Sequence, residues 1–173
     1  IDETPIAEVL ATPGRLRTIV SSGRIPAALF AGAIFEPFQG EGGYRHPSAS
    51  VIRGLKELCV RHGAIFIADE VQTFARTGRT FHSSGQGADP DIVCLAKSSI
   101  VGLTLLPADH ADVFGHGWHA NTFGSGRLFD VNYAHAVWDT FVNGREPIFH
   151  GHSYAENEQA KGAYLAEGLE RLV

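Results

Sequence analysis

Two charged residues, Asp69 and Lys97, stand directly after short apolar segments in this chain of 173 residues. Asp69 follows residues 64–68, and Lys97 follows residues 91–96. A lysine amine at the end of a strand can condense with an aldehyde, and a carboxylate can keep a pyridine nitrogen protonated. The pair would therefore suit a carbonyl cofactor with a pyridine ring. From this spacing alone a plainer interpretation stays open, in which Asp69 caps a turn and Lys97 is a solvated loop residue.

The segments that would position these two residues alternate between strand and helix patterns. Apolar runs typical of strands buried on both faces occupy residues 27–35, 64–68 and 91–96, and residues 103–106 are a fourth candidate. This order predicts an α/β fold with a mostly parallel sheet flanked by helices. In such sheets ligands bind outside the carboxyl ends of the strands, which is where Asp69 and Lys97 are expected.

A helix is predicted over residues 51–62, between the first two strands. Its N-cap would be Ser48 or Ser50, and Gly63 stands where a C-cap belongs. Two further helices are predicted near residues 130–142 and 154–172. The apolar stripe of the first helix comprises Val51, Leu55, Leu58 and Cys59.

The composition excludes several classes of function. The chain has 14 basic and 19 acidic residues, a formal charge of −5, and it has no basic cluster with which to bind nucleic acid or an anionic membrane. Its apolar runs are too short to cross a bilayer, and no signal segment opens it. Cys59 and Cys94 both lie in apolar stretches, which predicts two buried, reduced thiols and a cytoplasmic location.

Four segments in order carry a family resemblance. They resemble the class III aminotransferases, the ornithine, 4-aminobutyrate and acetylornithine transaminase group of fold-type I pyridoxal-phosphate enzymes. The resemblance runs from about residue 27 to the C-terminus and is strongest between residues 36 and 97. The segments are FEPFQGEGG (35–43), ELCVRHGAIFIADEVQTFARTGR (57–79), PDIVCLAKS (90–98) and HANTFGS (119–125).

The resemblance implies a role for each of five residues. Lys97 would hold pyridoxal 5'-phosphate as a Schiff base and, once displaced by substrate, would move the proton during transamination. Asp69 would pair with the pyridinium nitrogen, Val71 would pack against the ring, and Gln72 would bond to the ring hydroxyl. Thr122 would contact the cofactor phosphate of a neighbouring subunit, which implies a homodimer with shared active sites.

The reaction implied is ping-pong transfer of an amino group from an amine or amino acid to a 2-oxo acid. Glu36 and Glu41 match positions near the substrate, and Glu41 could form half of a gate between two substrates, although a solvated loop carboxylate explains it equally well. The chain has no Met and opens inside a helix-like pattern at residues 5–20. We therefore expect residues 1–145 to be part of the cofactor-binding large domain and residues 146–173 to lead toward a missing small domain.

The sequence departs from the family pattern at two loops. Family glycines are absent after Lys97, where residues 98–101 read SSIV, and after Thr73, where Phe74 stands. A catalytically degenerate protein of the same fold, or an aminomutase or racemase using the same cofactor, therefore stays open. A metal site is a further alternative, although no paired-ligand motif accompanies the histidines and we expect none. Its candidate ligands would be His110, His116, His119, His150 and His152.

Overall fold

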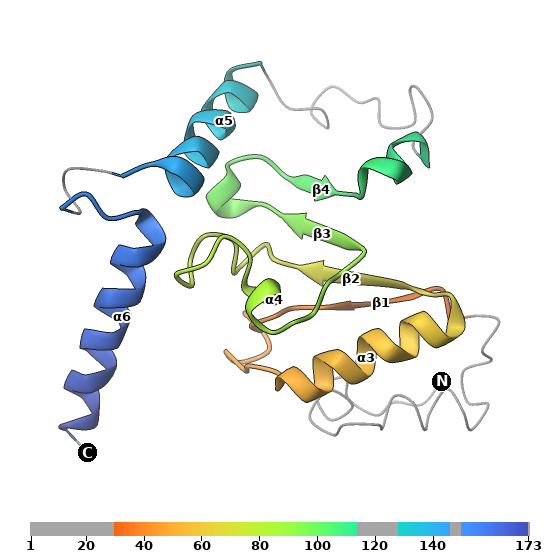
Figure 1. Ribbon diagram of the computed structural model, residues 1–173, viewed down its shortest axis with the longest axis horizontal. Coiled ribbons are helices and arrows are strands. Elements are labelled where there is room, and N and C mark those ends of the chain that lie inside the picture. Colours follow the sequence, from red (N-terminus) through yellow and green to blue (C-terminus); the bar gives the residue numbers. More distant parts are fainter. Residues whose placement is uncertain (1–29, 114–127, 146–149, 173) are drawn as a thin grey trace.

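A four-stranded sheet forms the centre of the computed structural model, which describes residues 30–113, 128–145 and 150–172. The strand order is β1-β2-β3-β4, with the first three strands parallel and β4 antiparallel to β3 (Figure 1). The prediction of an α/β fold with a mostly parallel sheet is confirmed. The strands are β1 (Gly32–Phe35), β2 (Ile65–Asp69), β3 (Ile92–Leu95) and β4 (Leu103–Leu105).

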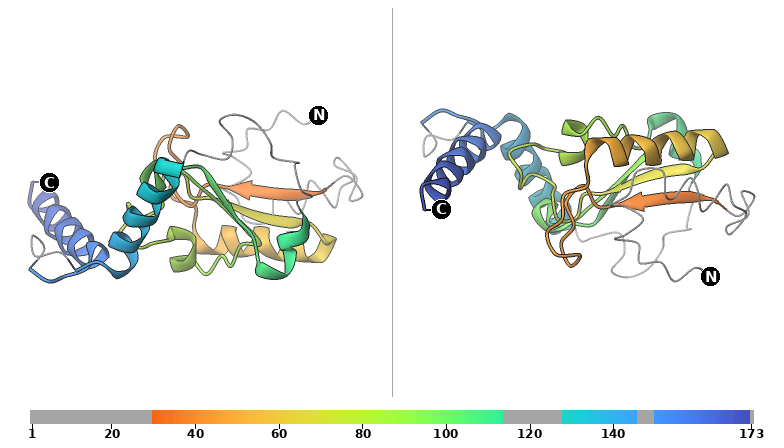
Figure 2. Two further views of the ribbon diagram at one scale, coloured as in Figure 1. Left: turned by 90° about the horizontal axis from the view of Figure 1, so that it is seen from above. Right: turned by 90° about the horizontal axis from the view of Figure 1, so that it is seen from below.

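Helix α3 lies beside this sheet, and helices α5 and α6 lie at the end toward which β1, β2 and β3 point (Figures 1 and 2). The three helices expected from the sequence are present, with ends that differ by no more than two residues from those predicted. The α-helices are α3 (Ala49–His62), α4 (His82–Gly85), α5 (Leu128–Asn143) and α6 (Tyr154–Glu170), and the 3₁₀ helices are η2 (Lys97–Ser99) and η3 (Ala108–Val113).

The ends of α3 are fixed by the residues that the sequence indicated. The Ser48 side chain accepts a hydrogen bond from the Val51 amide at 3.4 Å, so Ser48 is the N-cap. Gly63 ends the helix in the left-handed conformation, with φ 62°, and its amide bonds to carbonyls of the last turn. The predicted stripe is buried and packs on the sheet, as expected. It comprises Val51, Leu55, Leu58 and Cys59.

Only one face of the sheet is covered by α3 (Figure 2). On the covered side Phe35 and Phe66 stack with ring centroids 4.8 Å apart. On the other side Ile34 is 61% exposed among the described residues. The prediction that the first strand is buried on both faces is therefore wrong for this part of the chain, because no described helix covers the second face. Cys94 is also only half-buried, contrary to expectation, whereas Cys59 is fully buried.

Asp91 fixes the start of β3 against β2. Its carboxylate accepts the Phe66 amide at 2.8 Å and the Lys56 ammonium at 2.7 Å. Partial burial works to raise the pKa of Asp91, but the hydrogen bonds from Lys56 and Phe66 outweigh it and the pKa lies below its ordinary value. This contact sets the alignment of the two strands that carry the candidate site.

A second apolar cluster joins the loop after β2 to α5. Phe74 is fully buried, and its ring centroid lies 4.7 Å from that of Trp138. Phe81 and Phe141 also contact Phe74. A large aromatic side chain therefore anchors this loop where the family pattern has glycine. No helix in the described part of the chain is both long enough and apolar enough to cross a membrane.

Candidate active site

Asp69 and Lys97 leave adjacent parallel strands at the same edge of the sheet. Asp69 is the last residue of β2, and its Cα is paired with that of Cys94 on β3. The next amide, that of Glu70, donates to the Cys94 carbonyl at 2.8 Å. Lys97 comes three positions after Cys94 and begins η2. The structure thus places an amine and a carboxylate at the edge of the sheet where the parallel strands end, as the sequence predicted.

Lys97 is exposed, and its ammonium group donates a hydrogen bond to the Gln72 amide oxygen. The loop after β1 lies against the other side of Gln72: a Cβ added to Gly40 would lie 3.7 Å from Gln72 Cγ and 3.7 Å from Glu36 Oε2. Glu36 itself accepts the Gly40 amide at 3.0 Å. Gln72 therefore contacts Lys97 and lies next to the loop that contains Glu36, whereas Glu41 is a solvent-exposed residue of that loop.

The Asp69 carboxylate accepts a hydrogen bond from the described residues through one oxygen and accepts none from them through the other. Its Oδ1 atom accepts the Val71 amide at 3.0 Å, and no other hydrogen bond to this carboxylate comes from residues 30–113, 128–145 or 150–172. Oδ2 can therefore accept a further donor, such as a protonated ring nitrogen. Val71 and Asp69 are each half-buried, which suits contact with a flat ligand at the surface of the sheet edge.

Glu70 supports the site, although no role was predicted for it from the sequence. Its side chain is fully buried and accepts hydrogen bonds from the Thr73 hydroxyl, the His82 amide at 3.1 Å and the Ser83 amide at 2.7 Å. A buried carboxylate is tolerated when it is hydrogen-bonded in this way. Glu70 thus closes the base of the loop formed by residues 70–83, which carries Val71 and Gln72. A charged residue directly after an apolar strand was the signal that could have identified it.

Arg76 is a second supporting residue that the sequence did not indicate. Its Nε atom donates to the Ser98 hydroxyl at 2.7 Å, next to Lys97. Two residues of the same loop therefore contact the turn after β3: Gln72 bonds to Lys97, and Arg76 bonds to Ser98. This turn also contains a strained position: Ile100, in the segment after Lys97 where the family pattern has glycines, has φ 70°. The backbone shape that glycine favours is retained here by a β-branched residue.

A histidine pair lies beside the closed base of this loop. The Nε2 atoms of His46 and His82 are 2.9 Å apart, and Gln86 Nε2 is 3.0 Å from the same His46 nitrogen. Burial lowers the pKa of His82, and nearby His46 lowers it further, against the opposing effect of Glu70. The neutral form of His82 is therefore favoured.

Three of the five histidines proposed as metal ligands lie in the described part of the chain. Within residues 30–113, 128–145 and 150–172, no three His, Cys, Asp or Glu side chains gather in a way that could hold a metal ion. His110 lies 3.1 Å from Asp109, and His152 lies 3.8 Å from Glu156. His150 is exposed. The remaining two candidate ligands, His116 and His119, lie outside the described residues, as does Thr122.

The side chains at this edge fit pyridoxal 5'-phosphate chemically. Lys97 offers an exposed primary amine, and Asp69 has one carboxylate oxygen that can accept the ring N–H. Gln72 offers an amide within hydrogen-bonding distance of the amine, and Val71 offers a small apolar side chain. This set of an amine, an anion, a neutral hydrogen-bonding group and an apolar group is what a charged pyridine ring with an aldehyde requires.

Comparison with known proteins gives one consistent result. The Aminotransferase class-III family matches residues 21–173. The acetylornithine aminotransferase of Methanopyrus kandleri is 44% identical over 103 residues, which are 57% of this chain and 26% of that protein.

Two solved structures have the same fold. The acetylornithine aminotransferase of Elizabethkingia anophelis is 33% identical, with a TM-score of 0.65 over 75% of this chain and 34% of that one. An amine transaminase from an uncultivated Pseudomonas species, solved in its PLP-bound internal aldimine form, is 34% identical, with a TM-score of 0.59 over 78% of this chain and 33% of that one. The chain thus spans about a third or less of the length of these proteins.

Proposed function

Because the chain belongs to the class III aminotransferases, we propose that it supplies part of the active site of a pyridoxal-phosphate transaminase. The reaction is transfer of an amino group from an amine or amino acid to a 2-oxo acid in two half-reactions. The observation that carries this proposal is the emergence of Lys97 and Asp69 from adjacent strands at one edge, with Gln72 bonded to the lysine. The names of the matched transaminases support it.

Two residues would hold the cofactor. Lys97 would bind its aldehyde carbon covalently, and Asp69 Oδ2 would accept the ring N–H. When bound, the cofactor supplies an electron sink that stabilises negative charge on the substrate carbon. Asp69 maintains that capacity, because a carboxylate beside the ring nitrogen favours its protonated form.

The work of Lys97 in the reaction is proton transfer at its Nζ atom. When substrate has displaced it, the Lys97 amine would accept the proton from the substrate carbon at Nζ and would donate it to the cofactor carbon that was the aldehyde. Its hydrogen bond to Gln72 restricts where Nζ points. Gln72 accepts from Lys97 through Oε1, so its NH2 group would be the one that bonds to the ring hydroxyl oxygen, and Val71 would pack on the ring.

The remaining assignments stay predictions. Residues 1–145 would belong to a cofactor-binding domain, and residues 146–173 would lead into the next one. The protein would be a cytoplasmic homodimer in which Thr122 reaches the phosphate in the neighbouring subunit. Glu36, through its bond to the Gly40 amide, would shape the substrate side of the site, and Glu41 would be the exposed half of a gate.

The test is to add pyridoxal 5'-phosphate to the purified protein and record its visible spectrum. We expect a new absorbance band, and after borohydride reduction we expect the cofactor on the peptide that contains Lys97. The variant Lys97→Ala should show neither change. The control is Lys161→Ala, which removes an exposed lysine on α6 and should behave like the parent. Identical spectra for the parent and Lys97→Ala would refute the proposal.

A further inference from the structure

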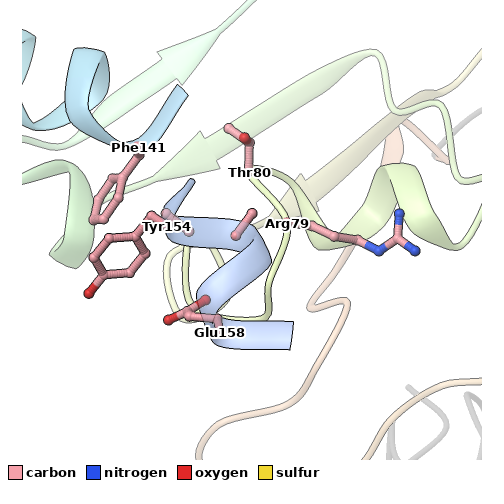
Figure 3. Close-up of a pocket in the computed structure, with 7 residues that line it drawn as sticks. Arg79, Thr80, Phe141, Tyr154 and Glu158 are labelled. Carbon is pink, nitrogen blue, oxygen red and sulfur yellow. The ribbon is translucent and has the colours of Figure 1, made fainter. Parts of the chain in front are cut away.

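Helix α6 holds one residue of the loop formed by residues 70–83, Gly78, through two consecutive side chains. Glu158 Oε2 accepts the Gly78 amide at 2.9 Å, and Gln159 Nε2 donates to the Gly78 carbonyl at 2.6 Å. Gly78 is buried, and Glu158 is half-buried. Figure 3 shows that Glu158 of α6 and the loop residues Arg79 and Thr80 line the same pocket. Both polar groups of Gly78 are therefore bound by the same helix.

The closeness of this contact depends on glycine at position 78. Gly78 has φ 71°, a conformation that side-chain-bearing residues rarely adopt. A Cβ added there would lie 2.6 Å from Gln159 Cγ and 3.6 Å from the Ala155 carbonyl oxygen. The loop and the helix thus meet by direct backbone approach. Phe141 of α5 supports the same place by packing edge-on against Tyr154, with ring centroids 4.7 Å apart (Figure 3).

The loop that α6 holds is the one that contacts Lys97. Its base is closed by Glu70, which accepts hydrogen bonds from both ends of the loop. Between base and tip, Gln72 bonds to Lys97, and Arg76 bonds to Ser98. Glu70 closes the base of the loop, and buried Phe74 anchors its middle. The contact of Gly78 with α6 holds the tip as well, and movement of the tip would disturb the contacts that Gln72 and Arg76 make.

We propose that Glu158 and Gln159 are positioning residues, which hold Gly78 and thereby fix the loop that places Gln72 against Lys97. This inference rests on the proposed function, because the contact it protects is the one at the cofactor-binding lysine. The two residues act through the loop and lie on a different element from Asp69 and Lys97. Neither was singled out by the sequence, since positions 78 and 158 are far apart along the chain.

The test compares cofactor binding in the full-length protein and in the double variant Glu158→Ala/Gln159→Ala. We expect the dissociation constant for pyridoxal 5'-phosphate to rise about tenfold, because two hydrogen bonds that order the loop are lost and each contributes a few-fold in binding. We also expect a shift in the pH at which the visible absorbance of the bound cofactor changes, because Lys97 would lose its fixed neighbour. A merely structural role for α6 would not move that pH.

Two matched variants complete the design. Glu158→Gln keeps an oxygen for the Gly78 amide and should bind the cofactor within about twofold of the parent. Glu170→Ala removes an exposed carboxylate from the far end of α6 and should have no effect. If the double variant does not fold, the single variants Glu158→Ala and Gln159→Ala carry the same test with smaller changes. Parent-like affinity and pH in the alanine variants would overturn the inference, whereas failure of the parent to bind cofactor would refute the proposed function instead.

Discussion

Replacing the buried carboxylate of Glu70 by Glu70→Ala should destabilise the protein by about 3 kcal/mol. Glu70 is fully buried and accepts three hydrogen bonds. Hydrogen bonds to a charged group each contribute about 1.5–3 kcal/mol, so a simple sum would give roughly 5–9 kcal/mol. The loss is smaller because the variant no longer buries a charge, the Thr73 hydroxyl can rotate, and water can reach the vacated space.

The measurement is urea-induced unfolding, with the free energy and the slope both fitted. Glu70→Gln keeps the shape and one acceptor oxygen, so its loss should be about 1–2 kcal/mol. The control Glu170→Ala, at an exposed carboxylate, should stay within about 0.5 kcal/mol of the parent. The reasoning fails if Glu70→Ala is as stable as that control, or if Glu70→Gln is the less stable of the two Glu70 variants.

Three further changes test other parts of the structure. Asp69→Asn keeps the shape but removes the charge beside the ring nitrogen, so turnover should fall about 100-fold while cofactor attachment persists; full turnover would contradict the role of Asp69. Ile100→Gly should raise the free energy of unfolding by about 1 kcal/mol, because relief of positive-φ strain exceeds the entropic cost of glycine; a lower urea midpoint would show that Ile100 is not strained. His46→Asn should raise the pKa of His82 in an NMR titration, because His46 is one of the groups that lower it. The folded pKa of His82 lies below its unfolded value, so its contribution to stability is present above the unfolded pKa and is lost as the pH falls through the folded pKa. His46→Asn should weaken that loss, and an unchanged titration would exclude the coupling.

The sequence by itself determined the elements and the positions of the two principal residues. Alternating apolar strands and an amphipathic helix with Ser48 and Gly63 at its ends are local patterns, so they could be identified without tertiary contacts. Parallel strands deliver their carboxyl ends to one edge, which is why Asp69 and Lys97 were expected together. The same reasoning wrongly predicted that the first strand is covered on both faces, because an apolar run does not specify what packs against it.

The supporting contacts were decided only by the tertiary structure. Glu70 was indistinguishable in sequence from an exposed strand-end carboxylate until the loop brought His82 and Ser83 back to it. The contact of Gly78 with α6 joins residues 80 positions apart. No local pattern encodes such pairs, since they depend on how separate parts of the chain come together in the folded protein. The chemistry at the strand ends is therefore specified locally, and the rigidity of the loop around it is specified by long-range packing.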